Sequence, residues 1–406
     1  MKVFCKKLNP CSARSVNLKQ YQDYICACGH TIVDNPDEAD TVLIWGCGFR
    51  TDYQNNTLEQ ANHYQEMGKN VYLGGCIPDI NPAMVEEKFR GGGKLIPWRE
   101  DEKLLKEFFN KSQDTVELKD IKMTLAKEPL CLNAEEYKRQ NPDKDACYLD
   151  EHIKVYVSEG CRLTCSYCSE KLMFPDYNSY PLQQILDDVK NEIEIFEKKY
   201  PNEKRIPVML QADSVGDYGK DIGLTLPDLI QGIIQMNDKV VVGLQGFNPA
   251  HFMEYYVQMI DFIKQNKILH LRLPIQNGNQ DILEKMGRKY TVDDIHKIFG
   301  LFNEMNFREF STDIIIGFPG ETESSFQETL DIVLKYKPKY ILLSAYMDFE
   351  RLPSYTLPDK VDQEVKLERL HRASELFISN GIYCSTDGGS MTNERRRRMN
   401  NDNRIM

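Results

Sequence analysis

Apolar runs alternate with amphipathic stretches along most of the chain. In its larger, second part six apolar runs are each expected to form a strand: 154–160, 207–213, 240–247, 268–276, 310–320 and 340–349. Between them, apolar residues recur at helical spacing in 181–200, 249–266, 291–305, 321–336 and 361–379. Strands that alternate with helices form parallel sheets. The pattern therefore predicts an α/β fold with a partial, TIM-like barrel of six βα units.

The first 110 or so residues carry a second βα pattern, which predicts a separate parallel sheet. Its expected strands are 2–8, 41–46 and 70–75, and helices are expected over 13–28 and 50–68. Each strand is closely followed by a cysteine: Cys11, Cys47 and Cys76. Because the carboxyl ends of parallel strands line one edge of a sheet, the three thiols are expected to converge there. The alternative is that they are buried as small apolar side chains.

A stretch within the predicted barrel, EGCRLTCSYCSEKL, contains Cys161, Cys165 and Cys168 just after its first strand. Zinc sites usually contain two CxxC pairs or add histidines, and this loop has neither. A compact set of thiolates suits an iron–sulfur cluster. Three ligands on a four-iron cluster leave one iron open, which is typical of a catalytic site. The alternative is a structural metal site completed by Cys147 or His152.

Other polar groups and glycines follow the predicted barrel strands, at the edge where ligands bind in such folds. Glycines there, such as Gly317 and Gly320, allow close approach of the backbone to a ligand. The residues predicted to contact a cofactor are Gln211, Asp213, Gln276, Asn277, Gly278 and Phe318. The alternatives are that Asp213 and Gln276 are capping groups and that the glycines belong to ordinary turns.

Composition narrows the class of protein. The chain has 406 residues, of which 41% are hydrophobic, so we expect two domains with real cores. Mean hydropathy is -0.51 and no apolar run reaches the length of a membrane span. The beginning of the sequence has no secretory signal pattern, so a cytoplasmic location is expected. Twelve cysteines then favour metal or redox chemistry over disulfides. The net charge of -11 argues against a generic nucleic-acid binder.

Several motifs resemble the radical SAM (S-adenosylmethionine) superfamily and, within it, the methylthiotransferases. The CxxxCxxC loop, with Tyr167 before its third cysteine, is similar to the superfamily motif. ADTVLIWGCGF and VYLGGC resemble the second and third cysteine motifs of the methylthiotransferase N-terminal domain. LPIQNGNQDILEKMGRKYT and DIIIGFPGETESSFQETL are similar to two signatures of its barrel, and 345–370 resembles the segment that leaves the barrel.

The resemblance implies SAM and two [4Fe-4S] clusters as cofactors. One cluster would be held by Cys161, Cys165 and Cys168, and an auxiliary one by Cys11, Cys47 and Cys76. The implied reaction uses a 5′-deoxyadenosyl radical from SAM and places SCH3 where a C–H hydrogen was. Most members of the family modify a tRNA adenosine, and one branch modifies a protein side chain. A reductant such as flavodoxin or ferredoxin would be a further partner.

The chain departs from the family pattern in three places. Its first motif reads NPCSARSVN where the family has GCxxN, so that Pro10 replaces a glycine. The loop after 207–213 reads LQADSVGDYGKD where the family often has GQdvnsYGxD. The family's C-terminal TRAM domain is expected to be missing, because too few residues follow Asn380. The expected divisions are an N-terminal domain (1–125), a linker (126–150), the barrel (151–380) and a short basic tail (381–406).

Several functions remain open at this stage. The preferred hypothesis for the substrate is a tRNA, and the alternative is a protein or peptide. Sulfur insertion without methylation and a non-enzymatic iron–sulfur protein are the other hypotheses. The tail run Arg395–Arg398 could contact phosphates, although a solvated tail is the simpler interpretation. Cys26 and Cys28 are expected to serve packing, and no role is assigned to Cys5, Cys131, Cys147 or Cys384.

Overall fold

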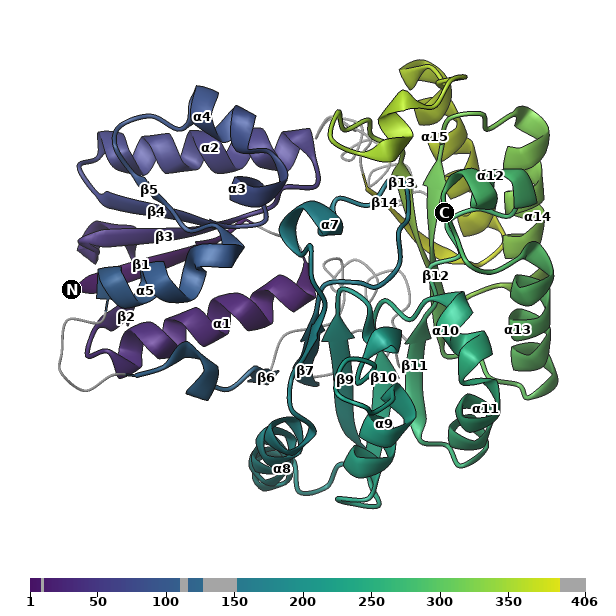
Figure 1. The fold of residues 1–406 in the computed structure, drawn as a ribbon. Coiled ribbons are helices and arrows are strands. Elements are labelled where there is room, and N and C mark those ends of the chain that lie inside the picture. Colours follow the sequence, from purple (N-terminus) through teal and green to yellow (C-terminus); the bar gives the residue numbers. More distant parts are fainter. Residues whose placement is uncertain (9–10, 110–115, 127–151, 388–406) are drawn as a thin grey trace, which may run out of the picture. The chain divides into compact units, whose positions relative to one another are not determined.

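The structure, a computed structural model, describes residues 1–8, 11–109, 116–126 and 152–387 (Figure 1). The chain forms two compact units, Met1–Leu273 and Pro274–Met406. The first unit contains the N-terminal sheet together with the first barrel strands, and the second contains the later barrel strands. Cys131, Cys147 and Arg395–Arg398 lie outside the described residues, as does nearly all of the predicted linker.

A five-stranded parallel sheet forms the N-terminal domain. Its strands are β1 (Lys2–Lys7), β2 (Thr31–Val33), β3 (Thr41–Gly46), β4 (Asn70–Gly75) and β5 (Lys94–Leu95). Its helices are α1 (Ser12–Ala27), α2 (Thr51–Glu66), α3 (Ile77–Ile80), α4 (Pro82–Lys88) and α5 (Asp101–Phe109). The strand order is β2-β1-β3-β4-β5, so the direction in which strands are added reverses between β1 and β3. In open α/β sheets, ligands bind beside such a reversal.

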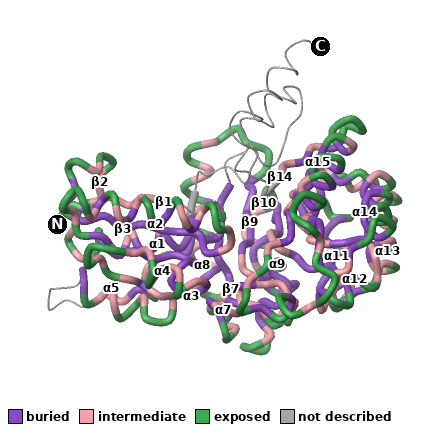
Figure 2. Tube along the Cα trace, turned by 90° about the horizontal axis from the view of Figure 1, so that it is seen from above, coloured by how far each residue is buried: buried purple, intermediate pink, exposed green. Residues whose placement is uncertain are grey.

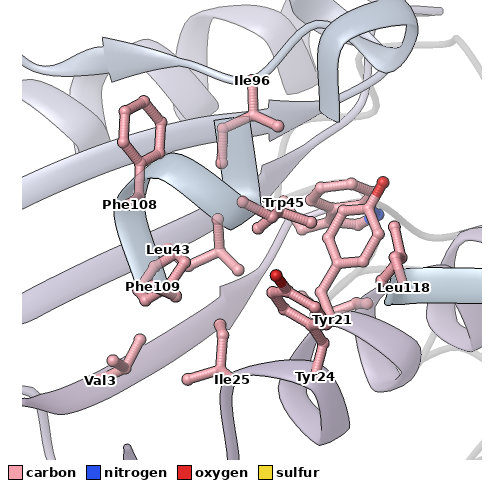
Figure 3. Packing of buried hydrophobic residues seen from close by; sticks show 12 residues of the cluster. Val3, Tyr21, Tyr24, Ile25, Leu43, Trp45, Ile96, Phe108, Phe109 and Leu118 are labelled. Carbon is pink, nitrogen blue, oxygen red and sulfur yellow. The ribbon is translucent and has the colours of Figure 1, made fainter. Parts of the chain in front are cut away.

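Helices cover both faces of this sheet because its central strand is apolar on both sides (Figure 1). Along a strand, successive side chains point to opposite faces. Leu43 and Trp45 of β3 therefore join α1 and α5 in one core, where the rings of Tyr21 and Trp45 lie 4.8 Å apart, edge to face (Figure 3). Ile44 faces the other way and packs with residues of α2 and α4. The result is a three-layer domain.

A partly buried carboxyl group borders the first of these cores and makes the stability of the chain depend on pH. The Tyr21 hydroxyl donates a hydrogen bond to the Asp101 carboxylate. Burial raises the pKa of Asp101 to about 7, although that bond opposes the rise. The folded protein thus keeps a proton that the unfolded chain releases at about pH 4. This contribution to stability is present at low pH and is lost as the pH rises from about 4 to about 7.

We therefore expect Asp101→Asn to raise the free energy of unfolding, relative to the unmodified chain, by more at pH 8 than at pH 5. The variant stays neutral throughout and so avoids ionising a buried carboxyl group. Urea unfolding of both proteins at the two pH values measures the effect. Asp261→Asn, on an exposed carboxylate, is the control and should show no such dependence. A difference between the Asp101 variant and the unmodified chain that is the same at both pH values would contradict the assignment.

The barrel strands of the first unit follow the order β6-β7-β9-β10-β11. The strands are β6 (Thr124–Ala126), β7 (Ile153–Glu159), β8 (Asn178–Ser179), β9 (Ile206–Ala212), β10 (Val240–Leu244) and β11 (Ile268–Arg272). The helices are α7 (Glu170–Met173), α8 (Leu182–Lys199), α9 (Leu226–Ile234), α10 (Pro249–Glu254) and α11 (Tyr256–Lys264). Neighbours from β7 to β11 are parallel, whereas β6 and β8 each run antiparallel to β7. Figure 2 shows how thoroughly β9 and β10 are buried.

The second unit continues the βα alternation with three parallel strands in the order β12-β13-β14. Its strands are β12 (Phe310–Ile316), β13 (Tyr340–Ala345) and β14 (Tyr383–Asp387). Its helices are α12 (Gln280–Lys285), α13 (Val292–Glu304), α14 (Glu323–Tyr336) and α15 (Gln363–Ser379). No helix within the described ranges is both long enough and apolar enough to cross a membrane.

The α/β class, the N-terminal parallel sheet and the six predicted barrel strands are confirmed. The prediction was wrong after residue 380, where a tail was expected to begin directly. Residues Tyr383–Asp387 instead form β14, which pairs in parallel with β13. Two hydroxyls from these strands, Tyr340 and Ser385, hydrogen-bond to each other. The stretch is short and largely polar, so it becomes a strand only because β13 offers an edge. The other domain boundaries remain predictions.

Candidate functional site

The three N-terminal cysteines follow the carboxyl ends of three neighbouring parallel strands. Cys11 lies beyond β1 as the N-cap residue of α1, Cys47 directly follows β3, and Cys76 directly follows β4 as the N-cap residue of α3. Two of these strands, β1 and β3, flank the reversal of strand order. The sheet topology therefore brings the three residues to the edge of the domain where a ligand is expected.

Glycines allow the loops that carry Cys47 and Cys76 to approach closely. The Cys76 amide donates a hydrogen bond of 2.9 Å to the Gly46 carbonyl. A Cβ on Gly75, whose φ is +85°, would lie only 2.3 Å from that same carbonyl oxygen. A Cβ on Gly48 would lie 2.8 Å from the Cys76 carbonyl oxygen and 2.9 Å from the Ile80 Cβ. Larger residues at these positions would separate the two cysteines.

We expect Gly48→Ala to weaken any cluster at these cysteines, because the added methyl group must push the backbone of Cys76 away. Overpacking of this kind costs about 1–3 kcal/mol of folding free energy. The measurement is iron bound per chain after anaerobic reconstitution, with urea unfolding of the metal-free protein. Gly300→Ala is the matched control, since nothing lies within 4 Å of a Cβ built there. Equal iron in the two variants would contradict the expectation.

Two of the three N-terminal thiols are buried. Cys47 is 4% exposed and Cys76 is 1% exposed, whereas Cys11 is exposed. Burial raises the pKa of Cys47 to about 11 and holds the pKa of Cys76 well above its usual range, and the charge of Cys11 adds to both shifts. Buried thiols stay protonated at neutral pH, so a metal bound here must displace their protons.

The second cysteine set lies in the loop that joins β7 to α7. Cys161, Cys165 and Cys168 are all partly buried. The Leu163 amide donates to the Cys161 sulfur over 3.4 Å, and the Lys171 ammonium donates to the Cys161 carbonyl. Burial raises the pKa of Cys161 to about 11. These contacts fix the backbone of the loop around Cys161.

Two carboxylates from the loop after β9 hold this cysteine loop in place. The Gly160 amide donates to Asp213 over 2.9 Å, and the Arg162 amide donates to Asp217 over 3.1 Å. The residues on either side of Cys161 are therefore both fixed. Asp217 was not singled out from the sequence, because its partner amide is far away in the chain and no local motif marks the contact.

Asp217 belongs to a buried charged group. Its side chain is 2% exposed and lies 3.0 Å from the His251 ring nitrogen Nε2, and the Ser214 hydroxyl donates to it over 2.8 Å. Burial alone would raise the pKa of Asp217, but the hydrogen bond and charge of His251 outweigh burial and hold that pKa well below its usual range. Asp217 is thus a carboxylate at any pH at which the protein would work.

The two cysteine sets lie close together within the first unit. The short helix α3, which follows Cys76, packs against α7, which follows Cys168. Two charged side chains act on Cys76 after its burial: Arg14, which lowers its pKa, and Glu170, which raises it. Glu170 is itself a near neighbour of the third cysteine in the loop. The space between the sets is therefore small enough for groups at one set to affect the other.

Of the predicted cofactor contacts in the first unit, Gln211 and Asp213 differ in their surroundings. Gln211 is 1% exposed, and neither polar atom of its side chain has a hydrogen-bond partner among the residues that the structure describes. Such a group is costly unless something bonds to it. Asp213, in contrast, is already held by protein groups, with Tyr156 and Gly160 donating to one oxygen and Arg14 to the other.

In the second unit, Asn277 and the backbone at Gly317 and Phe318 contact a common buried residue, Glu321. Glu321 accepts from the Asn277 amide group over 3.1 Å and from the Gly317 amide over 2.8 Å. Gln276 has a φ of +65°, and its Oε1 has no partner within the described part of the chain. Phe318 is fully buried, so its ring serves packing, and any ligand contact there would come from the backbone.

The donor sets can be compared with the cofactors that the sequence implies. Within the described residues, no three His, Cys, Asp or Glu side chains converge as they would around one metal ion. Neither cysteine set is therefore a preformed zinc site. A compact set of thiolates is instead the donor set of iron–sulfur clusters. The side chain of Gln211, which lacks a hydrogen-bond partner within the described residues, suits a polar ligand.

Comparison with known proteins agrees with this fold. Residues 155–333 match the Radical SAM superfamily. The cobalamin-dependent S-adenosylmethionine radical enzyme OxsB superposes with a TM-score of 0.55 at 11% identity, over 93% of this chain and 56% of OxsB. That likeness shows the fold alone. Fold and cysteine loop together define a radical SAM enzyme, which implies SAM and a [4Fe-4S] cluster as cofactors.

Related proteins identify the family within the class of radical SAM enzymes. "Probable threonylcarbamoyladenosine tRNA methylthiotransferase" of Pyrococcus horikoshii is 30% identical over 329 residues, 78% of this chain and 70% of the relative. Its namesake in Methanocaldococcus jannaschii is 31% identical, over 77% of this chain and 68% of the relative. The human threonylcarbamoyladenosine tRNA methylthiotransferase is 23% identical, over 92% of this chain and 62% of the relative. The chain belongs to the radical SAM methylthiotransferase family.

Proposed function

We propose that the chain attaches a methylthio group to threonylcarbamoyladenosine in tRNA, acting in the cytoplasm with a flavodoxin- or ferredoxin-type reductant. The names of the relatives supply the substrate. The observation that carries the proposal is the packing of α3 on α7, which brings the segment after Cys76 against the segment after Cys168. A methylthio transfer needs a sulfur donor within reach of an activated carbon.

In this proposal the two cysteine sets hold different clusters. Cys161, Cys165 and Cys168 hold the [4Fe-4S] cluster that binds SAM, and Cys11, Cys47 and Cys76 hold a second cluster. When bound, the first cluster and SAM supply a 5′-deoxyadenosyl radical, and the second supplies a soft site for sulfur. The chain itself excludes water, positions the loops and presents polar groups to SAM.

Individual residues divide these tasks. Asp217 and Asp213 fix the amides on either side of Cys161, so that the loop keeps its shape when a cofactor binds. Gln211 offers a side chain that lacks partners within the described residues, and we assign it to polar groups of SAM. Gln276, whose Oε1 lacks such a partner, remains a predicted cofactor contact of the second unit. Glu321 holds Asn277 and Gly317, so its part is to fix the turns around Gly278 and Phe318.

The experiment is a product assay without oxygen. The reconstituted full chain is incubated with dithionite, SAM and tRNA that carries threonylcarbamoyladenosine, and the nucleosides are weighed by mass spectrometry. Gain of SCH3 with loss of one hydrogen on that nucleoside supports the proposal. Gain of SH would indicate sulfur insertion without methylation. SAM cleavage with no change in the tRNA would contradict the proposed substrate. Matched tRNA lacking the threonylcarbamoyl group is the control and should remain unmodified.

A further inference from the structure

The guanidinium of Arg14 is buried where the N-terminal domain meets the first barrel strands, within the first unit. Arg14 lies in the first turn of α1, next to the N-cap residue Cys11, and is 1% exposed. Its guanidinium lies 4.6 Å from the ring centre of Phe174 and 5.5 Å from that of Trp98. A buried charge is retained only where specific partners compensate its desolvation.

Those partners belong to the barrel. One guanidinium nitrogen donates to Asp213, which follows β9, and another donates to the Tyr156 hydroxyl of β7 over 3.1 Å. Tyr156 in turn donates to Asp213 over 2.8 Å, so the three side chains close a ring. Asp213 is 3% exposed in its side chain, and the ion pair is thus shielded from solvent at both ends.

The same carboxylate reaches the cysteine loop. The Asp213 oxygen that accepts from Tyr156 also accepts from the Gly160 amide over 2.9 Å, one residue before Cys161. Arg14 is three residues after Cys11, and Asp213 contacts the residue before Cys161. One continuous set of hydrogen bonds therefore runs from the turn that carries a cysteine of the first set to the turn that carries a cysteine of the second.

Both ends of this ion pair fall in stretches that depart from the family pattern. In GCxxN the asparagine stands where this chain has Arg14, and in GQdvnsYGxD the glutamine stands where it has Asp213. An amide at each position would be neutral, whereas this chain has opposite charges at both. The structure shows that the two departures are in direct contact. Two changes that compensate each other are the simplest explanation for a charge pair at this depth.

We propose that Arg14 is a positioning residue that, through Asp213, fixes the turn of Cys11 relative to the turn of Cys161. Arg14 thereby sets the distance between the two cysteine sets. That distance determines what fraction of SAM cleavage events yields methylthiolated product. This role rests on the proposed methylthio transfer. Arg14 touches neither reacting group, and it acts only by holding the two turns together.

The test is a double-mutant cycle in the full chain with Arg14→Asn, Asp213→Gln and the two combined. Each single change removes the hydrogen-bonded partner of a buried charge and leaves Glu170, 3.8 Å from Arg14 in the unmodified chain, as a more distant neighbour. The combination restores a neutral pair at the two positions. The first readout is hydrogen exchange of the Gly160 segment in the metal-free chain. We expect faster exchange in both single variants and recovery in the double variant.

The second readout is the ratio of methylthiolated nucleoside to 5′-deoxyadenosine in the reconstituted protein. A small misplacement of reacting groups lowers rates on the order of 100-fold, so we expect the ratio to fall steeply in the single variants and to recover in the double. Arg14→Lys, which keeps the charge but not the planar guanidinium, should give an intermediate ratio and guards against loss of folding in the single variants.

Outcomes separate this inference from the proposed function. Additive effects in the cycle, or faster unfolding and exchange with an unchanged product ratio, would overturn the positioning role. If the unmodified chain makes no methylthiolated nucleoside, the proposed function fails, and hydrogen exchange still decides whether the two turns are coupled. Recovery of both readouts in the double variant supports the inference.

Discussion

Replacing Cys161, Cys165 and Cys168 together by alanine should abolish SAM cleavage and leave about four of about eight irons per chain. Replacing Cys11, Cys47 and Cys76 should also leave about four irons, yet SAM should still be cleaved to 5′-deoxyadenosine with no methylthio product. The reason is that in the proposed function each set holds its own cluster and each cluster has its own task. Iron, sulfide and product measurements on the reconstituted proteins provide the test.

Cys26→Ala and Cys28→Ala are the controls for this pair of variants. Both residues lie at the end of α1 and belong to neither set, so iron content and product should remain as in the unmodified chain. About four irons in the unmodified chain, and the same number after loss of Cys11, Cys47 and Cys76, would mean that the N-terminal set holds no cluster. The chain would then be a radical SAM enzyme with one cluster, and the proposed methylthio transfer would fail.

Asp217→Ala is expected to have the second-largest effect, on stability as well as on the cysteine loop. His251 would lose its buried partner and the Arg162 amide its acceptor, which together should cost about 3–5 kcal/mol of folding free energy. We also expect the loop at Cys161 to bind its cluster poorly while the N-terminal set is unaffected. Urea unfolding of the metal-free protein and iron per chain after reconstitution measure the two effects.

The pH dependence of this variant follows from the lowered pKa of Asp217. A carboxylate with a lowered pKa contributes stability above its unfolded pKa and loses that contribution as the pH falls through the folded value. The gap in stability between the variant and the unmodified chain should therefore be full at neutral pH and narrow below about pH 4. Asp261→Ala removes an exposed carboxylate and is the control. Equal unfolding midpoints for the two variants would rule out the role given to Asp217.

The sequence alone located the strands on which the site is built, because long apolar runs decide where central strands lie. β3 and β4 begin and end at the predicted residues, and so the positions of Cys47 and Cys76 relative to the sheet were predicted correctly. Short strands such as β2 and β5 were missed. Two or three residues carry no period of their own and are ordered by the neighbour with which they pair.

Long-range polar contacts are the part of the site that the sequence did not reveal. Arg14 was noted only as part of an altered motif, and Asp213 was assigned to a cofactor, whereas the structure pairs them with each other. His251 lies in a predicted helix, and its pairing with Asp217 depends on how that helix meets the loop after β9. Such contacts join residues far apart in the chain and leave no spacing by which to recognise them.

The two cysteine sets differ in how far apart their members lie in the chain. This difference affects the order in which folding and metal insertion take place. Cys161, Cys165 and Cys168 stand within eight consecutive residues, so closing them around a cluster costs little chain entropy even before the barrel has formed. Cys11, Cys47 and Cys76 meet only once β1, β3 and β4 are paired. Insertion of the proposed N-terminal cluster must therefore follow folding, whereas the barrel loop can accept iron on a chain that is still being organised.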